Sequence, residues 1–301
     1  MRVGVTGAAG FLGVAIVRLL TDRGHEVLPL DARPSTVAGL PVRAVDIRDV
    51  DGMVAAWERP DVVVHAAGVV GVAGAAAALV RSTSVNVLGS VSAALAARAA
   101  GASRILLLSS DEVYGETDSQ PVVEDSPCRP TSAYGTQKLA AERLAGAVAD
   151  ISSVSARVTW AYGPGFPRAR PPQPWIDDAR HGGISPRSPG ADHRADLVYV
   201  DDVAIAVGLL TEATALNYEA YNIGAGRSWS LRDVSDELRA LVPSWHIDLD
   251  PGLMPGISPR GPVDTRRIHT ELGWAPTFDL QTGLEDALRA RDPHLSRKVR
   301  A

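Results

Sequence analysis

Short apolar runs alternate with helical patterns along the first half of the chain. Arg2 to Thr6 is a β-branched run, and apolar residues then recur at helical spacing from Phe11 to Leu20. Strands that alternate with helices pair in parallel through right-handed crossovers, so the pattern predicts a doubly wound α/β sheet of the Rossmann type. The further elements expected are strands at Glu26 to Leu30, Val42 to Val45, Val62 to His65 and Arg104 to Leu108, and a helix at Val50 to Trp57.

A glycine-rich turn joins the first strand to the first helix. Gly7, Gly10 and Gly13 allow a tight turn, a close approach of backbone N–H groups to a pyrophosphate, and packing of the helix on the strand. The second strand ends at Asp31, where a carboxylate would meet ribose hydroxyls and repel a 2′-phosphate. The turn therefore predicts a site for NAD rather than NADP. Arg33, which would favour NADP, is interpreted as a solvated loop residue.

Further cofactor contacts are expected at the start of the first helix and at the ends of the next strands. Asp46 ends a strand near the expected position of the adenine, and the small residues after His65 let a cofactor pass close to the backbone. These additional candidates are Phe11, Leu12, Asp46, Ile47, Ala66, Ala67 and Gly68.

Composition and charge narrow the class of protein. The chain has 301 residues, 46% of them hydrophobic, and a formal net charge of -5, which gives no basic footprint for nucleic acid. Val62 to Val80 has the length of a membrane span, but its glycine and alanine content favours a buried strand and helix. The single cysteine, Cys128, and the absence of a signal-peptide pattern predict a cytoplasmic protein. We expect a small-molecule substrate and no nucleic-acid partner, membrane partner or metal.

Tyr134 and Lys138 lie one helical turn apart in the segment Ser132 to Glu142, so their side chains share one face. An ammonium favours the phenolate form of a tyrosine, which can then act as a general base or acid nearer neutral pH. Of the 30 basic residues only two are lysines, Lys138 and Lys298. Lysine at 138 therefore indicates that a compact ammonium is required there.

Several segments together resemble the extended short-chain dehydrogenase/reductase family of nucleotide-sugar epimerases and dehydratases. They are the turn TGAAGFLG, His65-Ala-Ala-Gly68, Asn86 in SVNVLGS, SSDEVYG from Ser109, Tyr134-Gly-Thr-Gln-Lys138, Tyr199-Val-Asp-Asp-Val203, Tyr221-Asn-Ile-Gly-Ala-Gly226, and Asp264 followed by Leu272-Gly-Trp274. The resemblance runs over nearly the whole chain, and it adds Asn86 to the expected cofactor contacts.

The resemblance implies a catalytic trio. Tyr134 would exchange a proton with a sugar hydroxyl, Lys138 would hold the nicotinamide ribose and support the phenolate, and Ser110 would hydrogen-bond the same oxygen. Asp111 and Glu112 stand where sugar 4,6-dehydratases are expected to have an acid and a base for loss of the 6-hydroxyl. An alternative interpretation is that both are polar loop residues.

Two positions depart from the family pattern. Trp160 stands where most relatives have a substrate-contacting asparagine, and Ala195 stands at the usual phosphate-binding arginine, with Arg194 displaced by one place. Arg260 keeps the place of the second diphosphate arginine. We therefore expect Trp160, Arg194 and Arg260 to contact a substrate, of which a nucleoside-diphosphate sugar is the best class. Further candidate anion contacts are Arg168, Arg170 and Arg187.

The chain divides into a NAD-binding domain at 1–165 and a smaller C-terminal substrate-binding lobe at 166–301, with roughly 198–225 returning to the first domain. Four prolines between Pro167 and Pro174 mark the start of the lobe. Alanine-rich helices around 75–100 and 140–149 permit close helix contacts, from which we predict a homodimer.

The resemblance leaves four functions to compare. An epimerase that works through a keto-sugar intermediate is favoured by the breadth of the resemblance. The alternatives are a 4,6-dehydratase that uses Asp111 and Glu112, a sugar or uronate dehydrogenase or ketoreductase, and a non-enzymatic dinucleotide sensor. A sensor would have no use for Ser110, Tyr134 and Lys138 together.

Overall fold

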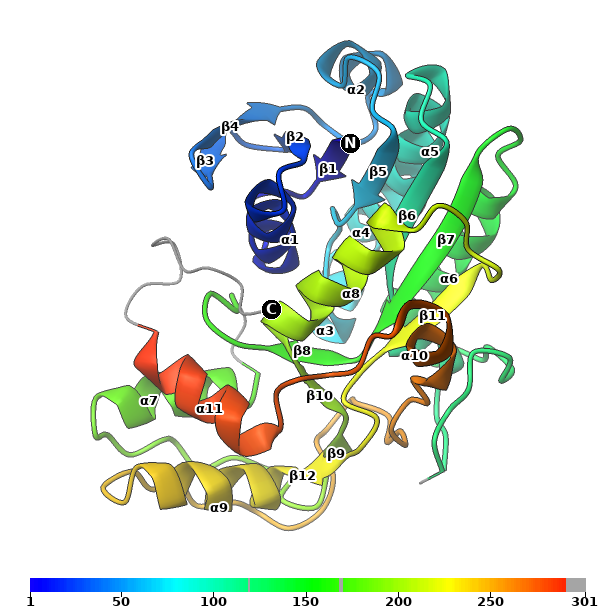
Figure 1. Cartoon of the computed structure of the whole chain (residues 1–301). Helices are drawn as coiled ribbons and strands as arrows, with labels where there is room; N and C mark the ends of the chain where they lie inside the picture. Colours follow the sequence, from blue (N-terminus) through cyan, green and yellow to red (C-terminus); the bar gives the residue numbers. More distant parts are fainter. Residues whose placement is uncertain (119, 168–169, 291–301) are drawn as a thin grey trace.

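The chain folds around one large sheet, with a smaller lobe on one side (Figure 1). The computed structural model describes residues 1–118, 120–167 and 170–290, so Arg168 and Lys298 lie outside the described residues. Within these ranges no helix is long and apolar enough to cross a membrane. The same ranges hold no group of three or more His, Cys, Asp or Glu residues that could bind a metal ion.

Eight strands of the described chain form the sheet in the order β11-β7-β6-β5-β1-β2-β4-β3, and each neighbouring pair is parallel except β3 with β4. The chain builds outward from β1 on one side and then crosses to β5 on the other. Open sheets bind ligands at the carboxyl ends of the strands where the order reverses in this way. The strands are β1 (Arg2–Thr6), β2 (Glu26–Asp31), β3 (Ser35–Val37), β4 (Leu40–Ala44), β5 (Val62–His65), β6 (Arg104–Ser110), β7 (Ser152–Val158) and β11 (Ala220–Ile223).

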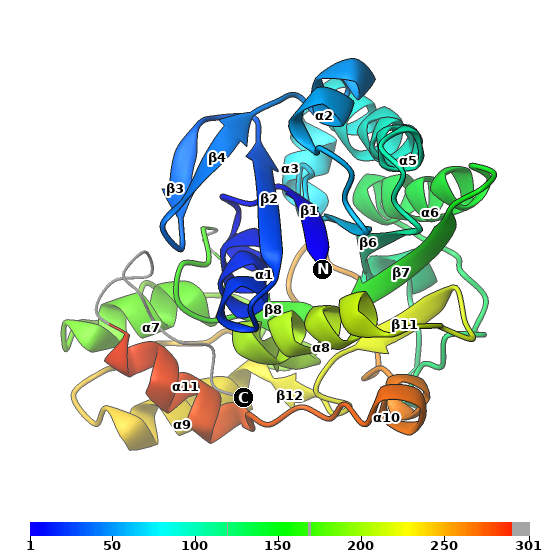
Figure 2. The same ribbon diagram turned by 45° about the horizontal axis from the view of Figure 1, so that its top comes forward.

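Helices cover both faces of the sheet because successive strand residues enter different hydrophobic cores. In β5, Val62 and Val64 pack with helices α1 and α8, whereas Val63 packs with α2, α5 and α6 (Figures 1 and 2). This arrangement confirms the predicted doubly wound fold. The helices are α1 (Phe11–Asp22), α8 (Val200–Glu212), α2 (Val50–Ala56), α5 (Gly89–Ala99) and α6 (Ala133–Gly146).

The alanine-rich stretch before α5 is not one continuous helix. It contains α3 (Val72–Ala77), α4 (Leu79–Thr83) and a π-helical turn, η1 (Ser84–Leu88), that runs directly into α5. Turns of this kind are frequent at functional sites. Asn86, a predicted cofactor contact, lies in η1 and is buried.

The smaller lobe is built mainly from helices α7, α9 and α11, which pack on one another. In it, the rings of Trp175 and Trp245 lie with their centroids 6.2 Å apart. Two short strand pairs, β8 with β10 and β9 with β12, connect this lobe to the sheet. The chain returns to the large domain in between, where α8 packs on α1 and β11 pairs with β7. The remaining elements are β8 (Trp160–Tyr162), α7 (Gln173–Arg180), β9 (Arg194–Ala195), β10 (Leu197–Tyr199), β12 (Trp229–Ser230), α9 (Leu231–Leu241), α10 (Arg266–Leu272), α11 (Leu280–Arg289) and the 3-10 turn η2 (Asp111–Tyr114).

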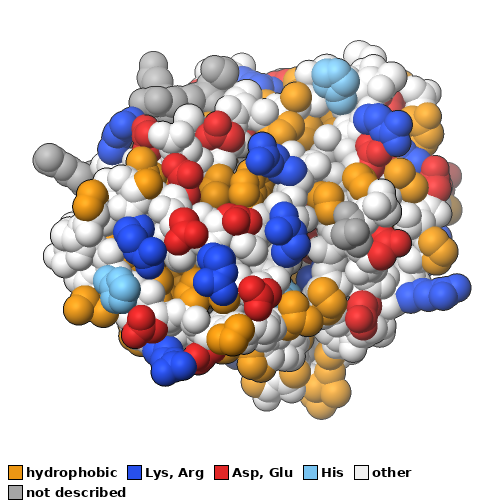
Figure 3. Space-filling model, turned by 90° about the horizontal axis from the view of Figure 1, so that it is seen from below, with side chains coloured by type: hydrophobic (Ala, Val, Ile, Leu, Met, Phe, Trp, Pro, Cys, Tyr) orange, Lys and Arg blue, Asp and Glu red, His pale blue; other side chains and the backbone are white. Residues whose placement is uncertain are grey.

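Acidic and basic side chains are interspersed on the face shown in Figure 3. Many of the exposed charges of the lobe are paired, as in Arg239 with Asp236. Arg187, a predicted anion contact, is largely solvent-exposed and pairs with the partly exposed Asp250. Such pairs contribute little to stability because water and salt screen them.

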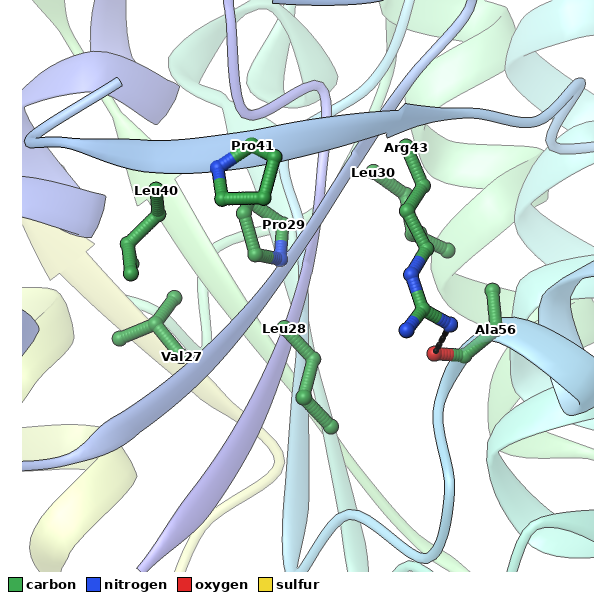
Figure 4. A pocket seen from close by; sticks show the side chains of 8 residues that line it. All are labelled: Val27, Leu28, Pro29, Leu30, Leu40, Pro41, Arg43 and Ala56. Atoms are coloured by element: carbon green, nitrogen blue, oxygen red, sulfur yellow. Dashed lines mark hydrogen bonds between the residues drawn. The ribbon is translucent and has the colours of Figure 1, made fainter. Parts of the chain in front are cut away.

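Strands β2 and β4 separate over most of their length, near the β3 edge of the sheet. β2 and β4 pair only at Leu30 with Arg43 and at Asp31 with Ala44. Pro29 in β2 and Pro41 in β4 lack the N–H that a ladder bond requires. The gap is a mostly apolar hollow of about 160 Å³, across which Arg43 donates a hydrogen bond to the carbonyl of Ala56 (Figure 4).

A buried ion pair ties α6 to β7. Arg157 contacts Glu142 at 2.8 Å, and each side chain is only 7% exposed. The same guanidinium donates to the Tyr114 hydroxyl at 3.0 Å and to the Glu124 carbonyl at 3.0 Å. The pair therefore fixes the helix that carries Tyr134 against the sheet.

Replacing Arg157 by Leu should lower the free energy of unfolding by about 3–5 kcal/mol, because the carboxylate of Glu142 stays buried without its partner. Urea unfolding measures the loss. The matched control is Arg289→Leu, which breaks an exposed pair with Glu285 and should cost less than about 1 kcal/mol. Equal small losses in both variants would contradict this assignment.

Candidate active site

Two positions at the turn between β1 and α1, Gly7 and Gly13, have room for glycine only. A Cβ at Gly7 would lie 2.5 Å from the backbone nitrogen of Ala67, and a Cβ at Gly13 would lie 2.0 Å from the Gly7 carbonyl oxygen. In the described structure no side chain caps the start of α1 at Gly10. Its backbone N–H groups and the positive end of the helix dipole therefore suit a pyrophosphate.

Two acidic residues end strands or follow them near this turn. Asp31 accepts a hydrogen bond of 3.1 Å from the backbone N–H of Ala9, so its carboxylate lies beside the glycine turn. Asp46 is half-exposed and pairs with Arg48. The hydrogen bond from that guanidinium lowers the pKa of Asp46 to about 2.

The apolar residues predicted to contact the cofactor, Phe11, Leu12 and Ile47, lie in different surroundings. Phe11 and Leu12 begin α1, and the ring of Phe11 meets that of Phe166 edge-on at 5.1 Å. Ile47 is buried, and a Cβ on Gly89 would lie 2.5 Å from its Cδ1. Because the Ile47 side chain packs into the core beneath α5, its backbone is the part left for a cofactor contact.

Asn86 fixes the chain just after β5. Its side chain accepts from the backbone N–H of Val69 at 2.7 Å and donates to the Val69 carbonyl at 2.9 Å. It also donates to the side-chain oxygen of Gln137 on α6 at 2.8 Å. A Cβ on Gly68 would lie 3.0 Å from Asn86 Oδ1 and 3.8 Å from Lys138 Nζ. Gly68, which follows Ala66 and Ala67, thus passes close to polar groups of η1 and α6.

Tyr134 and Lys138 lie together on α6, as the helical spacing predicts. Lys138 is buried and donates a 2.7 Å hydrogen bond to the Leu108 carbonyl, and its Nζ is 5.8 Å from the centre of the Tyr134 ring. Burial lowers the pKa of Lys138 to about 8, so the ammonium form predominates at pH 7. Burial, together with the charge of Lys138, lowers the pKa of His65 to about 3, which keeps this neighbour neutral.

Ser110 ends β6 next to two carboxylates that share one arginine. Its hydroxyl donates to Asp111 at 3.1 Å and accepts from the backbone N–H of Glu112 at 3.2 Å. Arg260 contacts Asp111 at 3.2 Å and Glu112 at 2.6 Å. The second oxygen of Glu112 accepts a 2.9 Å bond from Ser132, the residue that caps α6. Both oxygens of Glu112 are therefore occupied.

A buried carboxylate positions the chain around Arg260. Asp196 accepts hydrogen bonds from the backbone N–H groups of Ala225 at 2.6 Å, Gly226 at 3.2 Å and Val263 at 3.0 Å. Burial raises the pKa of Asp196 to about 7, although these three donors oppose that shift. The contacts hold the segment just after Arg260 against the lobe strands.

An aromatic corner adjoins Arg260. The guanidinium of Arg170 lies 4.2 Å from the Trp160 ring centre and 5.1 Å from that of Phe166. On the other side, the Trp160 ring is 5.6 Å from the ring of His193. Burial and the charge of Arg260 lower the pKa of His193 to about 4, so the imidazole is neutral at pH 7.

The structure does not place Arg194 in this corner. Its side chain is 56% exposed, donates to the Ser228 carbonyl at 2.5 Å and lies 3.9 Å from Asp233. His193, which the sequence reasoning missed, is buried there instead. The sequence did contain a signal for His193. Side chains two residues apart on a strand point to the same face, so residue 193, rather than 194, shares a face with Ala195.

Comparisons with known proteins show which family this chain is similar to. The NAD dependent epimerase/dehydratase family matches residues 3–224. A UDP-glucose 4-epimerase of Mycolicibacterium smegmatis is 32% identical over 94% of this chain and 96% of its own. A probable dTDP-glucose 4,6-dehydratase of Sinorhizobium fredii is 29% identical over 94% of this chain and 91% of its own. The solved structure of MoeE5 in complex with UDP-glucose and NAD has a TM-score of 0.83 at 29% identity, covering 96% of this chain and 97% of that one.

The residues present fit the cofactor of that family. The glycine turn leaves no space for side chains, the start of α1 is open to a pyrophosphate, and Asp31 stands beside both. Lys138 and Tyr134 share a helix at the carboxyl ends of the same sheet. The chain therefore belongs to the NAD-dependent epimerase/dehydratase family and is an NAD-dependent enzyme of this type, as its sequence predicted.

Proposed function

We propose that this enzyme is a nucleotide-sugar epimerase that acts through a keto-sugar intermediate. The observation that carries the proposal is that Lys138 lies beside the Tyr134 ring and donates to the carbonyl of Leu108, two residues before Ser110 at the end of β6. The similarity to a UDP-glucose 4-epimerase over 94% of the chain supports this choice of reaction. NAD, when bound, accepts a hydride from the sugar carbon and returns it.

The three side chains divide the proton chemistry of such a reaction. Tyr134 removes the proton from the sugar hydroxyl as the hydride leaves and gives it back when the ketone is reduced. The ammonium of Lys138 stabilises the phenolate. Ser110 donates a hydrogen bond to the reacting oxygen, and to do so its hydroxyl turns away from Asp111. Were the hydride that NAD supplies to return to the opposite face of the ketone, the carbon would be inverted.

The contacts of Glu112 favour epimerisation over dehydration. A dehydratase needs a base that reaches the proton on C5 and an acid that reaches the 6-hydroxyl. Here one Glu112 oxygen contacts Arg260 and the other accepts from Ser132, while Asp111 contacts Arg260 as well. Both carboxylates would have to break these contacts to take part in an elimination. We therefore assign them to positioning Arg260 and α6.

Product analysis tests the reaction directly. The NAD-loaded enzyme is incubated with UDP-glucose, UDP-glucuronic acid and dTDP-glucose, and the products are read by NMR and mass spectrometry. An epimerase gives a product of unchanged mass with one inverted centre. Loss of water would indicate the 4,6-dehydratase, and accumulation of NADH would indicate a dehydrogenase. Either outcome would overturn the proposal.

Tyr134→Phe should lower kcat by about 10²–10⁴-fold, the range typical of a lost general acid-base group. NAD affinity should stay within a few-fold, because the glycine turn and Asp31 are unchanged. Lys138→Met should differ by weakening NAD binding as well. Steady-state kinetics and calorimetric titration measure the two effects, and near-normal turnover of Tyr134→Phe would refute the assignment.

Asp31→Ala should weaken NAD binding by about tenfold and narrow the preference over NADP, because the ribose hydroxyls lose a charged acceptor. Calorimetry with both cofactors measures the change. Arg33→Ala is the control, and it should leave the NADP affinity nearly constant. Tighter binding of NADP than of NAD by the unaltered protein would contradict the role given to Asp31.

We also propose a homodimer, formed through the face of α4, η1 and α6. Four aliphatic side chains on these elements are exposed, Leu79 by 54%, Val80 by 85%, Leu88 by 59% and Leu144 by 48%. Apolar patches of this kind mark protein interfaces. Light scattering at micromolar concentration should give a dimer for the unaltered chain and a monomer for Val80→Glu/Leu88→Arg. Ile184→Arg, at an exposed position of the lobe, should stay dimeric. A monomeric unaltered chain would refute the proposal.

A further inference from the structure

Two buried polar atoms of the aromatic corner have no hydrogen-bond partner within the described residues. They are Nδ1 of His193 and Nη1 of Arg260. His193 is 2% exposed, and the Arg260 side chain is 9% exposed. Buried polar groups are nearly always hydrogen-bonded in folded proteins, so each such atom requires an explanation. A ligand oxygen is one partner that would satisfy both.

The two atoms belong to neighbouring groups. Burial is the main cause of the lowered pKa of His193, and the charge of Arg260 adds to it, so the guanidinium lies within electrostatic reach of the imidazole. Arg260 in turn reaches Asp111, whose other oxygen accepts from the Ser110 hydroxyl. Ser110, Asp111 and Arg260 are thus connected through direct contacts, and His193 lies close enough to Arg260 to respond to its charge. The Trp160 ring packs against the imidazole, with ring centroids 5.6 Å apart.

The chain lacks an arginine where its relatives are expected to bind a phosphate. Ala195 occupies that position, and Arg194 points toward Ser228 and Asp233 instead. The guanidinium of Arg260 is shared between two carboxylates, so much of its charge is already compensated. A phosphate group in this corner would need another donor close to Arg260.

We propose, resting on the function proposed above, that His193 is that donor and determines how the enzyme holds its substrate. Its Nδ1–H hydrogen-bonds an oxygen of the diphosphate of a nucleoside-diphosphate sugar, beside Nη1 of Arg260. His193 thereby takes over the role of the arginine that is expected at position 195, where this chain has alanine. Because the imidazole is neutral at pH 7, it contributes a directed hydrogen bond rather than a full positive charge.

Calorimetric titration of the NAD-loaded protein with UDP and with dTDP tests this role. His193→Phe keeps a ring against Trp160 but removes the donor, and it should weaken the tighter of the two nucleotides by about tenfold or more. His193→Gln restores a donor and should bind within about threefold of the unaltered protein. Arg194→Ala, the matched neighbour, should bind within about twofold. NAD affinity should be unchanged in all three variants.

The outcomes separate this inference from the proposed reaction. Unaltered nucleotide affinity in His193→Phe, or an equal loss in Arg194→Ala, overturns the role of His193. If the phenylalanine variant fails to fold, His193→Met gives the same comparison without a strong donor. An unaltered protein that binds neither nucleotide overturns both the inference and the substrate class. Nucleotide binding that depends on His193, in an enzyme that yields no epimer, supports the inference and overturns only the reaction.

Discussion

The active site depends on the burial of one ammonium group. Lys138 lies almost out of solvent, and a buried charge is costly unless it is hydrogen-bonded and compensated. The Leu108 carbonyl accepts its hydrogen bond, and Glu142, one turn further along α6, favours its charged form. Glu142 is itself held by Arg157. The position of the ammonium, and with it that of Tyr134, therefore rests on contacts that reach two strands of the sheet.

Arg260 connects the smaller C-terminal lobe to α6, the helix that carries Lys138. It lies far along the chain from Asp111 and Glu112, yet contacts both. Glu112 also accepts from Ser132, which caps the helix that carries Tyr134. Glu112 thus contacts both Arg260 and the residue at the start of α6. These contacts give Asp111 and Glu112 a structural role, so their presence does not require that they act as acid and base in an elimination.

The parts of the fold and site that could be predicted are those encoded locally. The alternation of strands and helices, the glycine turn, Asp31 at the end of β2, and the spacing of Tyr134 and Lys138 are short-range patterns. They predicted the doubly wound sheet, the family and the cofactor, which the structure and the comparisons confirm. The catalytic and binding roles of individual residues stay predictions.

Contacts between distant segments could not be predicted in this way. Nothing local connects Arg260 with the loop after β6, because the contact depends on how the lobe packs on the sheet. The hairpin of β3 with β4 was missed because three residues are too few to show a period. The sequence reasoning considered the charge of Arg194 next to Ala195 and did not consider His193, which the alternation of the strand places on the side of Ala195. The π-helical turn at Asn86 likewise has no signal in the apolar pattern.

The central claim is that the trio at Tyr134, Lys138 and Ser110 performs a reversible oxidation with bound NAD. The most direct measurement follows deuterium placed on the sugar carbon that product analysis identifies as inverted, with the enzyme in NAD-bound form and no added reductant. The account predicts that the deuterium returns to the same carbon of the inverted product, with no exchange into water. Deuterium released into water, transferred to C6 with loss of water, or retained in an accumulated reduced cofactor would contradict it.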